Sequence, residues 1–369
     1  LEKVKMNLYE VKKLKSIEVE LSSNCNAACP QCPRNNFGGE TLSTLPIQNW
    51  TLQQFKQHFD SSLIRSLQEF YFCGTYGDPL MCKDIVEICK YVKSVNEKCR
   101  IGIHTNGSLR DKETWLQLAK HTDFVAFAID GLADTNHLYR RHTSFDKILF
   151  NAHTFIKAGG TAKWDFIVFK HNQHQIEQAR QLAFLNGFEE FNSKKTSRFL
   201  SRTHEYIHKW PVKNKQGQIE YALEPPSDEF LNPSYADLIN ITNEYGTISN
   251  YGMNVEVSCW QMARQKLYVS ADGLVFPCGW LHDRMYGPDM ENHRDRLKIF
   301  EMLSRIGRHK ASIKHTPLKD ILEGEWMQML TDSWTNEDRM ERCGIQCGAH
   351  LKLLQFQNAD IDYRDQNET

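Results

Sequence analysis

Residues 17–32, with the sequence IEVELSSNCNAACPQC, carry the strongest signal in the chain. The first five residues of this stretch alternate apolar and charged side chains, which predicts a β-strand. Cys25, Cys29 and Cys32 follow within eight residues, so their thiols can converge on one metal centre. A tetrahedral zinc site normally needs a fourth ligand close by, and none is near in the sequence. Three thiolates are enough to hold a cubane iron–sulfur cluster that leaves one iron open to an exogenous ligand.

The strand and the cysteine loop begin an alternation of strands and helices that extends to about residue 192. Strands are expected at residues 17–21, 70–73, 100–104, 124–129, 163–169 and 189–192. Helices are expected near residues 51–59, 83–95, 112–120, 145–158 and 173–186. Six such units imply a parallel sheet with right-handed crossovers, either a doubly wound sheet or a partly closed barrel. In both folds the functional residues are expected in the loops at the carboxyl ends of the strands.

The alternation is lost after residue 200. Residues 201–254 contain Pro225-Pro226 and Pro233, and we expect a linker there with one helix near residues 235–245. Residues 266–270 and 274–276 read as two strands joined by a turn at Asp272-Gly273. We therefore divide the chain into an N-terminal extension (1–15), a core (16–200), the linker (201–254), a smaller α+β domain (255–356) and a polar tail (357–369).

The composition excludes several classes of protein. The 369 residues include 45 Lys and Arg against 46 Asp and Glu, and a formal net charge of -1 argues against a protein that coats nucleic acid or an anionic membrane. No apolar run approaches the roughly 20 residues of a membrane helix, and residues 1–5 are not followed by an apolar signal core. We therefore expect a cytoplasmic location, where the 11 cysteines serve as thiols or metal ligands and not as disulfides.

The spacing C-x3-C-x2-C resembles the signature of the radical S-adenosylmethionine (SAM) superfamily, whose three cysteines hold a SAM-binding [4Fe–4S] cluster. The likeness covers residues 15–200, because further family-like segments follow successive strands in the right order. Gly74-Thr75-Tyr76-Gly77-Asp78-Pro79, after the second strand, is similar to the family's Gly-Gly-Glu-Pro segment, whose backbone carbonyls receive the methionyl ammonium. The resemblance implies an α/β fold with a partial (β/α)6 TIM-like barrel.

The resemblance also implies SAM contacts after the later strands. Asn106 follows the third strand and Asp130 the fourth, where the family carries polar cofactor contacts. Val168 lies near the end of the fifth strand, where the family often packs an apolar residue on the adenine. Arg140, in the segment Leu138-Tyr139-Arg140-Arg141, resembles the arginine that pairs with the methionyl carboxylate, a task suited to a planar fork of donors. Arg141 is its close rival.

Three positions depart from the family pattern. Asp78 replaces the usual glutamate, and Tyr76-Gly77 replaces Gly-Gly. The backbone carbonyls, and not the side chains, receive the methionyl ammonium in the family. The resemblance therefore still implies that Gly74, Tyr76, Gly77 and Asp78 bind SAM. Gln31 stands where an aromatic residue commonly precedes the third cysteine.

Four further cysteines can form a second metal site. Cys259, Gly273 and Cys278 have the spacing C-x13-G-x4-C, which is similar to the C-x9–15-G-x4-C element of the SPASM and twitch extensions of this superfamily. A turn at Gly273 returns Cys278 beside Cys259, and Cys343 and Cys347 would complete four thiolates. A full SPASM extension carries about seven cysteines, so four imply the smaller twitch form with one auxiliary [4Fe–4S] cluster. A four-cysteine zinc ribbon is the alternative.

The resemblance implies an enzyme that cleaves SAM reductively to a 5′-deoxyadenosyl radical, which abstracts a hydrogen atom from a substrate. A fully ligated auxiliary cluster favours electron transfer, so we expect net oxidation of the substrate, with a flavodoxin- or ferredoxin-type electron donor. The alternative is a peptide (RiPP) maturase that makes a crosslink or epimerises a residue. Only residues 1–15 precede the first strand, which weighs against a built-in leader-binding domain but not against a separate recognition protein. A non-catalytic iron–sulfur or zinc-binding interaction module is a more distant third.

Overall fold

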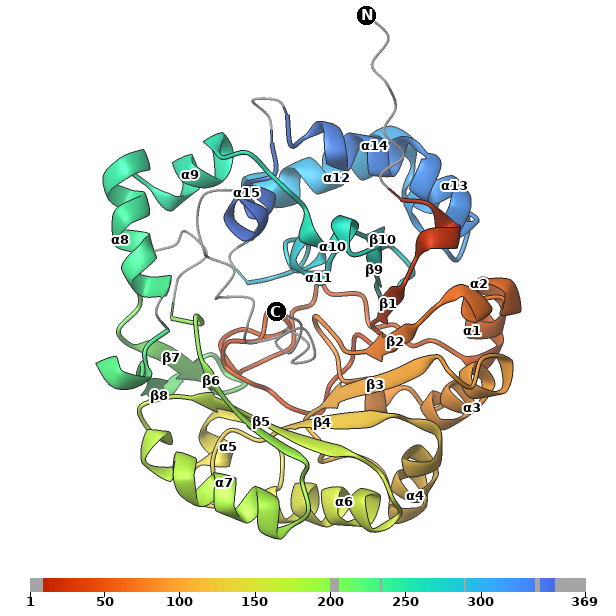
Figure 1. Ribbon diagram of the computed structural model, residues 1–369. Coiled ribbons are helices and arrows are strands. Elements are labelled where there is room, and N and C mark those ends of the chain that lie inside the picture. Colours follow the sequence, from red (N-terminus) through yellow and green to blue (C-terminus); the bar gives the residue numbers. More distant parts are fainter. Residues whose placement is uncertain (1–8, 200–205, 233, 289, 336–338, 349–369) are drawn as a thin grey trace, which may run out of the picture.

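Six parallel strands and the helices between them form a partial barrel. The strands are β1 (Ser16–Val19), β2 (Glu69–Phe72), β3 (Arg100–Thr105), β4 (Phe124–Ala128), β5 (Ala162–Val168) and β6 (Glu190–Lys195). Each strand pairs in parallel with the next along the chain. Figure 1 shows the strands as an arc with helices around its outer side. The expected partial barrel is therefore confirmed.

The structure is a computed structural model that describes residues 9–199, 206–232, 234–288, 290–335 and 339–348. The expected polar tail, 357–369, lies outside these ranges. Within them, no helix is both long enough and apolar enough to span a membrane.

The helices of the barrel are α1 (Leu52–His58), α2 (Ser61–Ser66), α3 (Ile85–Val95), α4 (Lys112–His121), α5 (Asn136–Tyr139), α6 (Phe145–Lys157) and α7 (Ile176–Leu185). Five of them, α1, α3, α4, α6 and α7, lie where the sequence predicted helices, whereas α2 and α5 were not expected. The apolar faces of the helices pack on the sheet. For example, the ring of Trp115 on α4 stacks on that of Phe127 on β4, with 5.2 Å between the ring centroids.

Alternate residues of each strand face opposite sides of the sheet. On β5, Trp164, Phe166 and Val168 belong to the core between the sheet and the helices. Asp165 and Ile167, on the other face, line the interior of the barrel. The barrel therefore has a helix-covered outer face and a mixed polar and apolar inner face.

Two C-terminal strands extend the same sheet. β9 (Lys266–Val269) pairs in parallel with β1, on the side opposite β2, and β10 (Val275–Phe276) pairs antiparallel with β9. Gly273 in the turn has φ +89°, and a Cβ there would lie 2.8 Å from the Oγ of Ser312. The expected hairpin is therefore confirmed, and it is joined to the barrel through β1.

The C-terminal helices surround this hairpin. They are α10 (Trp260–Ala263), α11 (Gly279–His282), α12 (Arg294–Ile306), α13 (Leu318–Glu323), α14 (Glu325–Asp332) and α15 (Glu341–Cys347). Trp326 on α14 donates a hydrogen bond to the carbonyl of Val275, and its ring lies 5.3 Å from that of Phe276. We had not expected α12, although its buried residues Ile299, Met302 and Leu303 have helical spacing.

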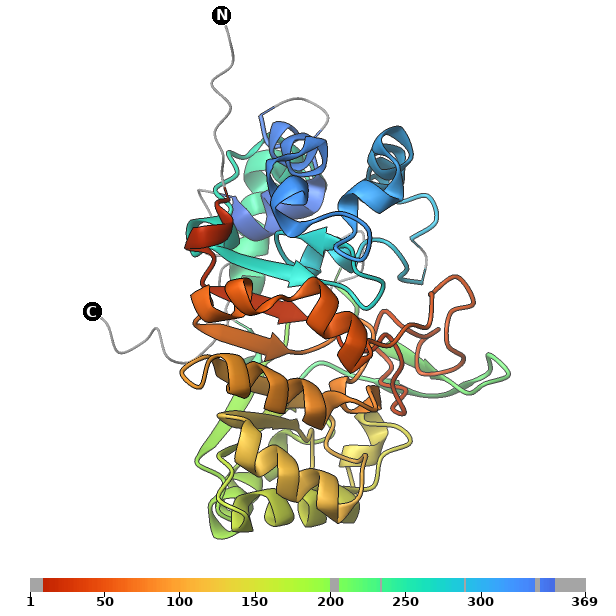
Figure 2. The ribbon, with the colours of Figure 1, turned by 90° about the vertical axis from the view of Figure 1, so that its right-hand side faces the viewer.

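Residues 201–254 contain more structure than the one helix we expected. The described part holds an antiparallel hairpin of β7 (Trp210–Lys213) and β8 (Ile219–Leu223), and α9 (Ile248–Asn254) follows α8 (Ser234–Tyr245). Figure 2 shows the β7–β8 hairpin projecting from the same end of the barrel as the loop after β1. Trp210 donates a hydrogen bond to the carbonyl of Pro30, 3.1 Å away, so the hairpin contacts the cysteine loop.

The buried carboxylate of Glu20 joins three segments at the end of β1. Its Oε1 accepts hydrogen bonds from the backbone N–H groups of Tyr76 (2.7 Å) and Gly77 (3.1 Å). Its Oε2 accepts from the hydroxyl of Tyr268 on β9 (3.1 Å) and from the N–H of Ala271 (3.4 Å). Burial raises the pKa of Glu20 to about 7, although these hydrogen bonds act to lower it. Glu20 therefore ties the loop after β2 to the C-terminal hairpin.

Replacing Glu20 by alanine should lower the free energy of unfolding by about 3 kcal/mol or more, because each buried donor left unsatisfied costs about 1–3 kcal/mol. Glu10 pairs with Lys13 on the exposed surface, so Glu10→Ala should cost less than about 1 kcal/mol. Urea denaturation of both variants measures the difference. Equal and small losses would show that Glu20 does not hold these segments together.

Candidate active site

The three cysteines of the loop after β1 line one cavity of about 540 Å³ inside the barrel. Cys25, Cys29 and Cys32 are free thiols. Burial raises the pKa of Cys32 to about 11 and raises that of Cys25 far above its usual range, and the neighbouring cysteines add to both effects. Such thiols become anionic ligands when a metal centre takes the place of their protons.

Hydrogen-bond donors surround the sulfur atoms. The backbone N–H of Ala27 lies 3.4 Å from the Sγ of Cys25, and the Nδ2 of Asn106 lies 3.7 Å from the same atom. The Nη1 of Arg140 lies 3.7 Å from the Sγ of Cys29. Donors at these positions stabilise anionic sulfur. The three thiols and their surroundings therefore fit the ligand set of a cluster with one open iron.

The loop after β2 is packed too tightly for side chains at its glycines. A Cβ on Gly77 would lie 1.8 Å from the carbonyl oxygen of Ser22, and one on Gly74 would lie 2.2 Å from that of Gly77. The side chain of Tyr76 is buried, and its hydroxyl donates a hydrogen bond to the carbonyl of His282. The backbone of this loop therefore runs directly along the cysteine segment.

Asp78 joins this loop to the end of β3. Its carboxylate accepts hydrogen bonds from the N–H of Leu80, the hydroxyl of Thr105 and the N–H and Nδ2 of Asn106, all at 2.9 Å. Asn106 also donates to the Oδ1 of Asn26, between the first two cysteines. Burial raises the pKa of Asp78, while these donors lower it. Asp78 thus positions the asparagine beside Cys25.

Arg140 and Asp130 form a buried ion pair beside the cavity. The Nε of Arg140 lies 2.6 Å from the Oδ2 of Asp130, whose side chain is 0% exposed. The other oxygen of Asp130 accepts a hydrogen bond from the N–H of Ile167. Arg141 points elsewhere and pairs with Glu220 of the β7–β8 hairpin, which is 42% exposed. The two neighbouring arginines therefore have different surroundings, and only Arg140 lines the cavity.

The cavity brings together most of the residues that the sequence suggested as SAM contacts. Its lining includes Gly74, Tyr76, Gly77, Asp78, Asn106 and Arg140. Asp130 lies behind Arg140 and is outside the lining. Val168 faces the helix-covered side of the sheet, and its neighbour Ile167 is the apolar residue of β5 that lines the cavity.

A polar network inside the barrel was not expected from the sequence. The Oδ2 of Asp165 on β5 lies 2.7 Å from the Nζ of Lys194 on β6 and 3.3 Å from the Nε2 of His104 on β3. Burial would raise the pKa of Asp165, but Lys194 and His104 hold it below its usual range. All three side chains line the cavity. Each of these residues is a polar side chain within an alternating strand, and this pattern could have predicted that it faces the barrel interior. The sequence does not show that the three strands bring these side chains together.

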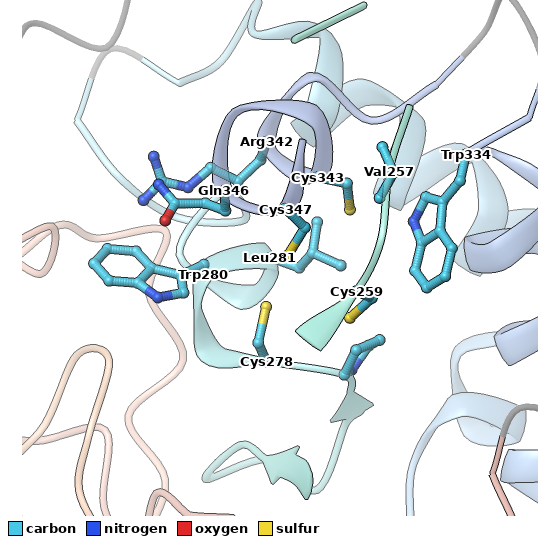
Figure 3. A pocket seen from close by; sticks show the side chains of 11 residues that line it. Val257, Cys259, Cys278, Trp280, Leu281, Trp334, Arg342, Cys343, Gln346 and Cys347 are labelled. Atoms are coloured by element: carbon cyan, nitrogen blue, oxygen red, sulfur yellow. The ribbon is translucent and has the colours of Figure 1, made fainter. Parts of the chain in front are cut away.

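The four C-terminal cysteines line a second, small pocket (Figure 3). Cys259 precedes α10, Cys278 precedes α11, and Cys343 and Cys347 lie one turn apart on α15. Figure 3 shows their sulfur atoms pointing toward a common space. Burial raises the pKa of Cys278 to about 12, and Cys259 adds to this effect. The structure therefore brings together all four cysteines that the sequence suggested.

Close packing places α15 against this pocket. A Cβ on Gly344, between the two cysteines of α15, would lie 1.9 Å from the carbonyl oxygen of Gly252 on α9. The N–H of Ser258 donates a hydrogen bond to the carbonyl of Cys347 at 2.9 Å, which brings Cys259 beside the end of α15. Among the described residues, no three His, Cys, Asp or Glu side chains converge closely enough to hold a single metal ion.

The small pocket and the large cavity share a wall. Cys278, Trp280, Arg342 and Gln346 line both. The four-cysteine pocket therefore adjoins the chamber that contains the first three cysteines.

Residues 19–183 match the model of the Radical SAM superfamily. Among solved structures, the chain is similar to SuiB of Streptococcus suis, with 14% sequence identity, a TM-score of 0.51, and coverage of 87% of this chain and 68% of that chain. It is also similar to native anSMEcpe with bound AdoMet and the Cp18Cys peptide, with 16% identity, a TM-score of 0.52, and coverage of 93% and 94%. At these identities the likeness shows a shared fold. A comparison with curated proteins finds no match.

Asp130→Asn should lower the free energy of unfolding by about 3 kcal/mol, because an amide opposite Arg140 leaves a buried guanidinium without its carboxylate. Glu220→Gln is the matched control, since it removes the partner of the neighbouring arginine at an exposed site and should cost less than about 1 kcal/mol. Urea denaturation measures both changes. Similar costs for the two variants would contradict the buried pair.

Proposed function

We propose that this protein is a radical SAM enzyme, because residues 19–183 match the Radical SAM superfamily model. Cys25, Cys29 and Cys32 would hold the SAM-binding [4Fe–4S] cluster. When it is bound together with SAM, this cluster would supply the 5′-deoxyadenosyl radical chemistry that removes a hydrogen atom from a substrate. The observation that carries this proposal is that three thiols line one cavity together with two side chains directed at their sulfur atoms, Asn106 and Arg140.

The residues around the cavity would orient SAM. Arg140 would bind the methionyl carboxylate, because its Nε is held by Asp130 while its Nη1 reaches the cysteine loop. The backbone of residues 74–77 would receive the ammonium group, and the tight packing at Gly77 holds that backbone against the cysteine segment. Ile167 is the apolar residue of β5 that is available to the adenine, next to the Val168 that the resemblance suggested.

We propose that Cys259, Cys278, Cys343 and Cys347 hold an auxiliary [4Fe–4S] cluster in a twitch-like C-terminal domain. Four thiols from three segments match the ligand number of a closed cluster. They also match a structural zinc site, which is the rival assignment. The wall that this pocket shares with the main cavity supports the cluster, because an electron acceptor is useful beside the substrate chamber and a structural zinc ion has no need of that position.

The reaction we favour is net oxidation. Loss of a hydrogen atom from the substrate leaves a radical, and removal of one electron and one proton completes the oxidation. The auxiliary cluster would receive that electron, and a flavodoxin- or ferredoxin-type protein would supply electrons to the first cluster. Peptide maturation by crosslinking or epimerisation is the second candidate, because the similar anSMEcpe structure contains a bound peptide.

Arg140→Ala should weaken SAM binding by about 1.5–3 kcal/mol, the usual scale for a hydrogen bond to a charged group. Arg141→Ala should leave SAM affinity nearly unchanged, because that side chain binds the β7–β8 hairpin. Calorimetric titration of the iron-loaded protein compares the two variants. A larger loss with Arg141→Ala would mean that the two arginines have been assigned in the wrong order.

Anaerobically reconstituted protein should carry about eight irons per chain, in two cubanes of four. The triple variant with alanine at Cys25, Cys29 and Cys32 should retain about half of this iron and should form no 5′-deoxyadenosine. Alanine at Cys259 and Cys278 should remove the other half. Iron and zinc analysis with a deoxyadenosine assay measures these outcomes. One equivalent of zinc, and no iron in the triple variant, would exclude the auxiliary cluster.

A further inference from the structure

Two arginines that form no ion pair with an acidic side chain of the described residues lie in the wall of the main cavity. Arg284 follows α11 and is 4% exposed, and Arg342 lies in the first turn of α15. The Nε atoms of both are buried and have no hydrogen-bond partner in the described part of the chain. The only hydrogen-bond contact of the Arg284 guanidinium there is with the sulfur of Met290, 4.0 Å away. Both side chains line the cavity, and the charge of Arg284 acts on Arg342.

Other buried cations of this cavity are neutralised by carboxylates. Arg140 pairs with Asp130, and Lys194 pairs with Asp165. A buried guanidinium without such a partner loses hydration without compensation, and a second one beside it adds repulsion. This arrangement is therefore costly unless negative charge lies nearby, from the thiolates of the four-cysteine pocket beside Arg342 or from an anion in the cavity.

Two nearby carboxylates, Asp283 and Asp295, act on the charge of Arg342. Asp295 accepts hydrogen bonds from the N–H groups of Glu341 and Arg342, both at 2.8 Å, and so holds the start of α15. Arg342 therefore has partial compensation, whereas the contact of the Arg284 guanidinium within the described residues is with a sulfur atom and not with a carboxylate.

The Arg342 side chain is directed away from the cysteine pocket. Its guanidinium lies over the ring of Trp280, 4.6 Å from the centroid. Figure 3 shows its end beside Gln346 and above Trp280, pointing away from the four sulfur atoms. The stacking fixes the plane of the fork and leaves its N–H edge available to a ligand.

We propose that Arg284 and Arg342 bind an oxyanion group of the substrate, a carboxylate or a phosphate monoester. This rests on the proposed function, in which the cavity is the substrate chamber. Planar guanidinium forks bind such groups through paired hydrogen bonds. The cavity as a whole suits an anion, because eight Lys and Arg side chains line it against five Asp and Glu. The anion would anchor the substrate at the wall shared by the two cysteine sites.

The test is calorimetric titration of the iron-loaded full chain with inorganic phosphate, acetate and the uncharged acetamide. Phosphate or acetate should bind and acetamide should not, and the tighter of the two anions identifies the substrate group. Arg284→Gln and Arg342→Gln should each weaken anion binding roughly tenfold or more, the scale of a lost hydrogen bond to a charge. Arg284→Lys, which keeps the charge but loses the fork, should weaken it less. Arg305→Gln, at an exposed position of α12, is the matched control and should change nothing.

Iron content and SAM affinity are measured on the same samples. Both should be unchanged in the glutamine variants. Anion binding of parental strength in these variants, or acetamide binding as tight as that of acetate, would overturn the proposal. Loss of iron with unchanged anion binding would also overturn it, because the arginines would then serve the four-cysteine site. A third outcome separates the two proposals. If the parental protein does not bind SAM but the glutamine variants still lose anion binding, the oxyanion site is supported and the proposed function is contradicted.

Discussion

The site depends on a single buried carboxylate, that of Glu20 at the end of β1. Four donors reach it from the loop after β2 and from the C-terminal hairpin, so the two segments cannot move independently. The loop in turn carries Asp78, which places Asn106 against the first cysteine. Gly77 completes this constraint, because its missing side chain lets the loop touch the backbone at Ser22. Removing Glu20 would therefore loosen the cysteine loop from two sides.

Much of the fold was readable from the sequence, because its units are local. The strand–helix alternation, the cysteine loop and the turn at Gly273 each depend on a few neighbouring residues. The β7–β8 hairpin was missed, because Pro211 in β7 and a polar turn hide the strand pattern. The meeting of Asp165, Lys194 and His104 depends on register between strands, which no short window contains. A shift of one residue along β5 separates Val168, in the outer core, from Ile167, in the cavity.

The structure places the two groups of cysteines on either side of a shared wall, which their spacing in the sequence does not reveal. The first group lies in a loop at the end of the barrel, and the second lies at the short helices α10, α11 and α15. Cys278 and its neighbours Trp280, Arg342 and Gln346 border both spaces, so a molecule in the barrel would touch the wall of the second site. Under the proposed function, the side chains on that wall would influence both substrate binding and electron transfer. The main cavity is thus bordered by the three cysteines of the loop after β1 on one side and by the wall of the four-cysteine pocket on the other.

The pairing of β9 with β1 has a consequence for the integrity of the protein. β1 is an interior strand only because a segment from far along the chain covers one of its sides. Without that segment, the backbone groups of β1 on that side would form an open sheet edge directly beside the cysteine loop. Open edges recruit strands from other molecules, so the barrel alone would tend to associate with copies of itself. The C-terminal part is thus a protective cover for the barrel as well as the bearer of a second site.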